Sequence, residues 1–131
     1  MRIIKFSADN VANELADITD DELDALAFGA VELNREGRIL RYNAAEADIS
    51  GRDQAGMVGR DFFADVAPCT CGEAFEGRFR AGVKTGKMDV QFTYVLDHEM
   101  DATEVRVRMH TVEGKDTYWV LIKRVTPTVA Q

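Results

Sequence analysis

The sequence predicts an α+β domain with a central antiparallel five-stranded sheet, flanking helices and an N-terminal helical cap. Two observations predict the sheet. Apolar runs at 29–33 and 38–42 flank a turn, which indicates a hairpin. In the last third of the chain, apolar side chains alternate with polar ones at residues 89–96 and 105–109, as in strands with one buried face. A further strand-like run, residues 118–125, closes the set. Antiparallel strands with helices gathered beside them define the α+β class.

Residues 1–28 predict the helical cap. Val11, Leu15 and Ile18 recur at helical spacing and form one apolar stripe. Thr19 or Asp20 can cap a second short helix, because a side-chain oxygen there satisfies free amides of the first turn. We therefore expect two short helices ahead of the first strand.

The middle of the chain predicts further helices. Residues 43–75 have no long period, but 59–66 favours a short helical piece. Residues 76–85 favour one longer helix, with Gly86 as its stop. We expect one domain overall, divided into a cap at 1–28, a core at 29–125 and a short tail at 126–131.

The composition is typical of a soluble globular protein, with 46% hydrophobic and 30% charged residues in a chain of 131. A net charge of −7 repels phosphate groups, so we expect neither nucleic acid nor membrane as a partner. No apolar run approaches the roughly 20 residues of a membrane helix. Two cysteines do not make a secreted disulfide framework, so we expect a cytoplasmic protein. We also expect a monomer.

Tyr42, Glu46 and Ser50 are spaced by four, which places their side chains on one face where the backbone is helical. A phenol, a carboxyl and a hydroxyl so placed could surround one oxygen of a ligand. The alternative is structural. Asn43 can be the N-cap of a helix, and the Glu46 side chain can accept a hydrogen bond from the Asn43 backbone amide, as in a variant of the capping box. Tyr42 can be a core residue at the end of a strand. The spacing alone leaves both open.

Cys69, directly after Pro68, is the second candidate. A free cysteine is usually a small buried apolar residue. A metal site needs about four ligands, and Cys69 with Cys71 is a weak signature for one, even with His98 and His110 added. A disulfide between the two cysteines would close a very small ring, and no elbow motif marks a catalytic thiolate. Spacing does not separate a pigment thioester from an inert thiol.

Several short strings of the sequence carry a resemblance to a known family. The most specific are residues 65–70, Asp-Val-Ala-Pro-Cys-Thr, and residues 42–46, Tyr-Asn-Ala-Ala-Glu. With the strings at 22–24, 26–30, 49–53, 61–63 and 118–120, they resemble the photoactive yellow proteins. The resemblance runs from near the N-terminus to Val125, and a PAS domain in general would not share the string around Cys69.

The resemblance implies a PAS fold and a blue-light photoreceptor that is not an enzyme and binds no metal. The chromophore would be 4-hydroxycinnamic (p-coumaric) acid, bound as a thioester to Cys69, with a photocycle that starts by trans-to-cis isomerisation. Tyr42 and Glu46 would hydrogen-bond its phenolate. Ser50 would support Tyr42, and Arg52 would lie over the pocket. The remaining pocket residues would be Phe62, Val66, Ala67, Thr70, Tyr94 and Met100. An unknown downstream protein would receive the signal.

The chain departs from the family's best-known pattern at four positions. Ser50 stands where the pattern has threonine, and Cys71 is an additional cysteine. Leu96 and His98 replace aromatic residues. We expect these changes to affect colour and photocycle rate but not the anchor at Cys69.

Elementary electrostatics explains why these residue types suit a phenolate. A free phenol has a pKa near 10, and burial raises it further. Two O–H donors, Tyr42 and a protonated Glu46, favour the charged form instead. Proton donation by Glu46 after isomerisation would leave a buried carboxylate, which costs several kcal/mol. We expect the fold to respond by loosening the cap at 1–28, and this loosening to be the signal.

Two other classes fit parts of the sequence. A non-photoactive PAS module that binds another small ligand or a protein partner would share the architecture but not the Cys69 string. A thiol enzyme or redox switch would use Cys69 and Cys71, but the sequence carries no catalytic constellation around them.

Overall fold

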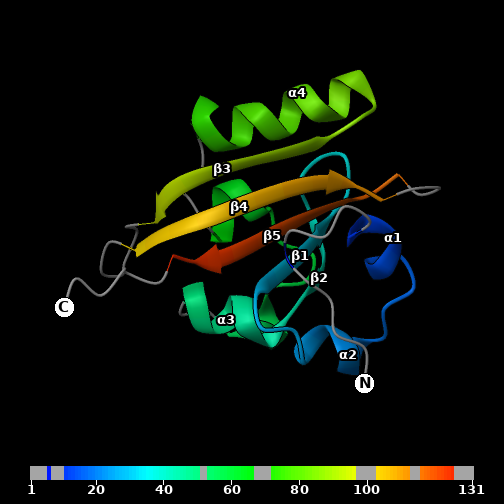
Figure 1. The fold of residues 1–131 in the computed structure, drawn as a ribbon, viewed down its shortest axis with the longest axis vertical. Helices are drawn as coiled ribbons and strands as arrows, with labels where there is room; N and C mark the ends of the chain where they lie inside the picture. Colours follow the sequence, from blue (N-terminus) through cyan, green and yellow to red (C-terminus); the bar gives the residue numbers. More distant parts are fainter. Residues whose placement is uncertain are drawn as a thin grey trace.

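A computed structural model describes residue 6 and residues 11–50, 53–66, 72–96, 103–112 and 116–125. Five strands form one antiparallel sheet in the spatial order β2-β1-β5-β4-β3 (Figure 1). The strands are β1 (Gly29–Leu33), β2 (Ile39–Tyr42), β3 (Asp89–Leu96), β4 (Thr103–Thr111) and β5 (Tyr118–Arg124). The predicted five-stranded antiparallel sheet is therefore confirmed.

The predicted hairpin is β1 and β2, and it starts its return strand at Ile39 rather than residue 38. Asn34 shapes the turn, because its Oδ1 accepts hydrogen bonds from the amides of Glu36 (3.0 Å) and Arg38 (2.9 Å). Gly37 has a φ of 91°, a left-handed conformation that favours glycine. Arg38 leaves the ladder and forms an isolated bridge with Asp61, so the edge of β2 is partly covered by the middle of the chain.

The central strand β5 is buried on both faces. Tyr118, Val120 and Ile122 belong to one core cluster, while Trp119 and Leu121, which alternate with them, belong to a second. Successive side chains of a strand point to opposite faces of the sheet, so the two clusters lie on opposite sides of it. The first cluster contains residues of the helical middle of the chain, and the second contains residues of the N-terminal segment.

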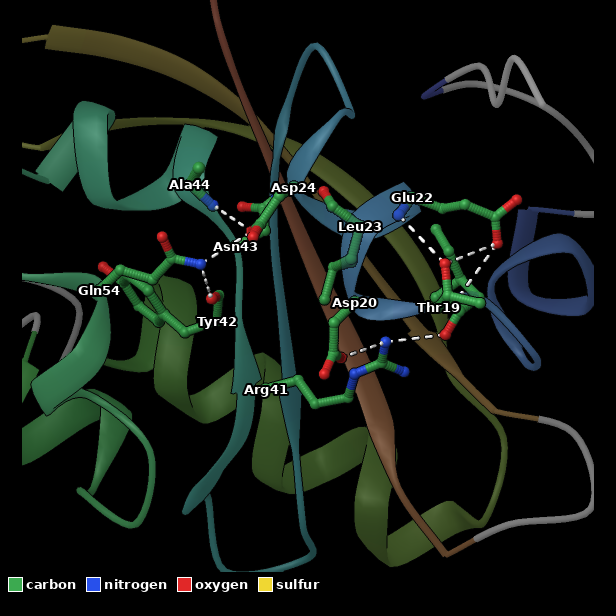
Figure 2. A network of polar contacts seen from close by, with 11 residues as sticks. Thr19, Asp20, Glu22, Leu23, Asp24, Arg41, Tyr42, Asn43, Ala44 and Gln54 are labelled. Atoms are coloured by element: carbon green, nitrogen blue, oxygen red, sulfur yellow. Dashed lines mark hydrogen bonds and ion pairs between the residues drawn. The ribbon is translucent and has the colours of Figure 1, made fainter. Parts of the chain in front are cut away.

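The N-terminal segment contains two short helices, α1 (Val11–Leu15) and α2 (Asp20–Asp24). Ile18 follows the end of α1 but is buried with Val11 and Leu15, so the predicted apolar stripe packs as one cluster. Thr19 is the N-cap of α2 in a capping box with Glu22 (Figure 2). Arg41 of β2 holds this segment to the sheet, since its Nη2 donates to the carbonyl of Ile18 at 2.8 Å.

The helical middle of the chain departs from the prediction in two places. The helical middle consists of α3 (Ala44–Ser50), a 3₁₀ turn η1 (Gln54–Gly56), π-helical turns η2 (Phe62–Val66) and η4 (Glu73–Gly77), and α4 (Arg78–Thr85). The single helix expected at 76–85 is instead η4 followed by α4, and it ends at Gly86 (φ 81°) as expected. The piece expected at 59–66 begins only at Phe62, because Gly59 has a φ of 90°. In the described parts of the chain, no helix is long and apolar enough to cross a membrane.

Candidate functional site

The N-terminus of α3 places Glu46 against the sheet. Asn43 is fully buried, and its Oδ1 accepts hydrogen bonds from the amides of Glu46 and Ala30, both at 2.9 Å. The predicted N-cap at Asn43 is therefore confirmed. The reciprocal half of the capping box is absent, because the Asn43 amide donates to the carbonyl of Ala30 at 3.2 Å. The Glu46 carboxyl is thus not needed to cap its own helix.

The Glu46 carboxyl is buried and one of its oxygens is unpaired. The residue is only 2% exposed, and Oε1 has no hydrogen-bond partner among the residues that the structure describes. Gly29 at the start of β1 makes room for it, since a Cβ on Gly29 would collide with this oxygen. Buried polar groups in proteins are nearly always paired, so an orphaned carboxyl oxygen marks a position where a ligand or another group is needed.

Burial also changes the protonation of Glu46. Removal from water penalises the charged form and raises the pKa of Glu46 from its usual 4.5 to about 8, against the smaller opposing effect of the Arg124 guanidinium. The carboxyl is therefore mostly neutral at pH 7. A neutral carboxyl has an O–H group that can donate a hydrogen bond to a buried anion or serve as a proton source.

Tyr42 is the last residue of β2, directly before the Asn43 cap, and only 4% exposed. It pairs with Val31 of β1, and its carbonyl accepts a hydrogen bond from Gln54 Nε2 at 3.1 Å. The strand end and the first turn of α3 therefore place a phenol and a neutral carboxyl four residues apart. Tyr42 and Glu46 therefore do not share one helix, and the alternative that Tyr42 is a core residue at a strand end is confirmed.

Phe62 and Tyr94 lie in one aromatic cluster, although they come from η2 and β3. Phe75 joins them: its ring centroid is 6.1 Å from that of Phe62 and 5.2 Å from that of Tyr94, the latter in an edge-to-face arrangement. Phe92 packs on the same ring at 5.3 Å. These rings and Tyr42 belong to the core cluster that contains the helical middle of the chain, so this side of the sheet carries a group of aromatic side chains.

Several predicted site residues fall outside the described residues, namely Arg52, Ala67, Cys69, Thr70 and Met100, as do Cys71 and His98. For Ser50 and Val66, the last residues of α3 and η2, only the backbone is described. The site assignment as a whole stays a prediction.

Sequence reasoning missed three residues as site residues: Gly29 and Arg124, which act on Glu46, and Phe75, which belongs to the aromatic cluster. Gly29 and Arg124 lie at the start of β1 and the end of β5, far from Glu46 in the chain. Phe75 was assigned only to the apolar side of a helix, and helical periodicity cannot show that its ring reaches both Phe62 and Tyr94. Only the pairing of β1 with β5 could have indicated the first two.

Comparisons with known proteins agree with this arrangement. Residues 23–128 match the family model described as PAS fold, which confirms the predicted fold. The photoactive yellow protein of Rhodothalassium salexigens is 46% identical over 125 residues, which cover 95% of this chain and 100% of that protein. That of Halochromatium salexigens is 45% identical with the same coverage.

A solved structure gives the same result. The photoactive yellow protein domain of the sensor histidine kinase Ppr from Rhodospirillum centenum matches with a TM-score of 0.82 at 38% identity, over 86% of this chain and 98% of that one. The chain therefore belongs to the photoactive yellow protein family, whose members are PAS-fold photoreceptors and not enzymes.

Proposed function

We propose that this protein is a cytoplasmic blue-light receptor that holds 4-hydroxycinnamic acid as a thioester on Cys69 and signals by loosening its N-terminal segment. The observation that carries the proposal is the buried Glu46 carboxyl, whose Oε1 has no partner among the described residues. Family membership supports a bound chromophore, and the string around Cys69 supports its attachment there.

The residues present fit such a chromophore. Glu46 and Tyr42 are a buried carboxyl and a buried phenol at adjoining ends of α3 and β2, and both can donate an O–H group to a phenolate oxygen. Phe62 and Tyr94 supply aromatic rings that meet in one cluster through Phe75. Ser50, Arg52, Val66, Ala67, Thr70 and Met100 complete the proposed pocket. When bound, the chromophore supplies absorption of blue light and isomerisation about its double bond.

In the dark, Glu46 keeps its proton because burial raises its pKa to about 8. The neutral carboxyl then donates a short, strong hydrogen bond without placing a second negative charge beside the phenolate. The burial of Glu46 and Tyr42 keeps water away, which strengthens that bond. After illumination, we propose that Glu46 would pass this proton to the phenolate oxygen, which becomes a neutral phenol, and Glu46 would be left as a carboxylate inside an apolar core.

The cost of that buried charge is the source of the signal. A buried, unpaired carboxylate costs several kcal/mol, against a total stability of about 5–15 kcal/mol for a domain. Asn43 connects the first turn of α3 to the N-terminal segment, because its Nδ2 donates to the carbonyls of Leu23 (2.9 Å) and Phe28 (3.1 Å). A shift of α3 that exposes Glu46 would therefore strain those two bonds and release the segment.

Reconstitution tests the chromophore. The purified protein is mixed with activated 4-hydroxycinnamic acid, and its visible spectrum is recorded in the dark and after blue light. We expect a new band that bleaches, recovers in darkness and is absent from Cys69→Ala, with Cys71→Ala as the matched control that keeps it. A folded protein without the band would exclude this chromophore and favour a PAS module for another ligand.

Infrared spectroscopy tests the proton. The light-minus-dark spectrum of the pigmented protein should show loss of a protonated carboxyl, and this loss should be absent from Glu46→Gln. Hydrogen exchange of residues 11–28 should accelerate in the light. An unchanged carboxyl signal in Glu46→Gln would remove Glu46 from the mechanism.

A further inference from the structure

A groove of about 510 Å³ lies on the outer edge of β2, between α2 and the segment 53–58. We call it the α2–β2 groove, and its defining residues are Asp20, Asp24, Leu40, Asp53, Gln54 and Val58. Figure 2 shows four of its polar members, with Asp20 of α2 facing Arg41 and Asp24 of α2 facing Gln54. Of its lining residues, the dark-state mechanism proposed above uses only Tyr42.

The groove contains unusual apolar surface. Leu40 is 40% and Val58 59% exposed, and these are two of the three large apolar side chains that are exposed in the described part of the chain. The third, Val95, lies on β3, at the opposite edge of the sheet. Single exposed apolar residues are common, but two that line one groove indicate a binding surface.

The rim of the groove is acidic. Asp20, Asp24 and Asp53 line it and are exposed, with Arg41 as the one cationic residue of the described lining. Arg41 is already paired with Asp20 at 3.0 Å, and the Asp20 side chain is itself 90% exposed. The lining therefore keeps a negative charge that complements lysine or arginine on an occupant.

The shape of the groove favours a short polypeptide segment. A small-molecule ligand is normally enclosed over most of its surface, whereas Leu40 and Val58 face solvent. A volume of about 510 Å³ holds a few side chains and not a whole protein face. A peptide segment with an apolar side chain between Leu40 and Val58 and basic residues near Asp20, Asp24 and Asp53 would match both the apolar surface and the acidic rim of the groove.

One wall of the groove belongs to the segment that is proposed to loosen in the light. Gln54 Nε2 donates to Asp24 Oδ1 of α2 at 2.8 Å and to the Tyr42 carbonyl of β2 at 3.1 Å, so it joins the two walls. Asp24 also accepts the amide of Ala44 at the start of α3 at 3.0 Å. Movement of α2 would break these contacts and separate Asp20 and Asp24 from Leu40.

We propose that the α2–β2 groove is the dark-state docking site for a short basic and apolar segment of a partner protein, which is released in the light. The light-dependent half of this inference rests on the proposed function; the docking half does not. The partner's segment is recognised by an apolar side chain that covers Leu40 and Val58 and by cations that face Asp20, Asp24 and Asp53.

Fluorescence anisotropy tests docking with a labelled peptide of alternating leucine and lysine, and with a matched peptide of leucine and glutamate. We expect the dark protein to bind the lysine peptide and not the glutamate peptide. The double variant Leu40→Ser/Val58→Ser should weaken binding about tenfold, the factor expected for one lost apolar contact. Val95→Ser, the matched change on β3, should leave it unchanged.

The charges are tested in the same way. Asp20→Asn should weaken binding of the lysine peptide, and Asp116→Asn should not, although Asp116 is also an exposed aspartate paired with an arginine. Equal binding of the two peptides, or equal effects of the groove and control variants, would overturn the docking site. So would sedimentation as a dimer that Val58→Ser makes monomeric, because a second copy would then be the occupant.

Blue light tests release. Pigmented protein that bleaches and lets go of the peptide supports the inference, and protein that bleaches but keeps its affinity overturns the light-dependent half. Protein that never bleaches contradicts the proposed function, and binding to it in the dark still decides for or against the docking site.

Discussion

Gly29 of β1 lies against Glu46 of α3 with no room for a side chain between them. A Cβ on Gly29 would lie 3.2 Å from both Cα and Cβ of Glu46 and would collide with its Oε1. Backbone conformation does not require the glycine, since the positive-φ glycines of the described chain are Gly37, Gly59 and Gly86. The close approach of β1 to α3 is therefore what buries the Glu46 carboxyl.

Gly29→Ala should displace Glu46. Its methyl group meets the backbone of α3 as well as a flexible oxygen, so we expect a loss of about 1–3 kcal/mol in the free energy of unfolding, as for other overpacked sites. Urea unfolding measures it. Gly56→Ala is the control, because nothing lies within 4 Å of a Cβ there. Equal stability of both variants would mean that α3 yields without cost.

The free energy of unfolding should depend on pH through Glu46. Its pKa is about 8 in the folded protein and 4.5 when exposed, so between these values only the folded state holds the proton. This contribution is fully present below pH 4.5 and is lost as the pH rises through about 8. Its size is a few kcal/mol.

Glu46→Gln should remove that dependence, because glutamine stays neutral at every pH. Urea midpoints of the unpigmented protein between pH 5 and 9 measure it, with the exposed turn residue changed in Glu36→Gln as the control. The same slope in wild type and Glu46→Gln would mean that the carboxyl is ionised or solvated in the folded protein.

Arg124→Gln should raise the pKa of Glu46 further. The Arg124 guanidinium lowers that pKa, and the variant removes its charge. A pH titration of the protonated-carboxyl infrared band measures the shift, with Glu46→Gln as the blank. Asp48→Asn is the matched control, because it breaks the 3.2 Å ion pair with Arg124 but keeps the guanidinium. A rise in both variants would assign the effect to the ion pair and not to the cation.

Asn43→Ala should destabilise the protein by about 3 kcal/mol, because it removes four buried hydrogen bonds to the amides and carbonyls of four residues. These are Leu23, Phe28, Ala30 and Glu46. Asn43→Ser keeps an oxygen that can cap α3 and should cost less. Hydrogen exchange at the amides of Ala30 and Glu46 locates the loss. Unchanged exchange there would show that water replaces the side chain.

Local patterns in the sequence determined most of the fold. Alternating side chains predicted β3 over its full length, and the turn at residues 34–37 predicted the β1–β2 hairpin. Thr19 was one of two predicted caps for α2, and the capping interpretation of Asn43 was one of two left open. These features depend on contacts between residues close in the chain. The helical middle was predicted less well, because left-handed glycines and π-helical turns interrupt the simple period there.

The candidate site divides in the same way. Short sequence strings alone indicated Tyr42 and Glu46 as site residues and indicated the family of the chain. Only the tertiary structure decided that the Glu46 carboxyl is neutral and that its Oε1 has no partner in the described part of the chain, since this depends on the approach of Gly29 and on the Arg124 guanidinium. Burial and charge are sums over neighbours that the fold brings together from distant parts of the chain, and no local period records them.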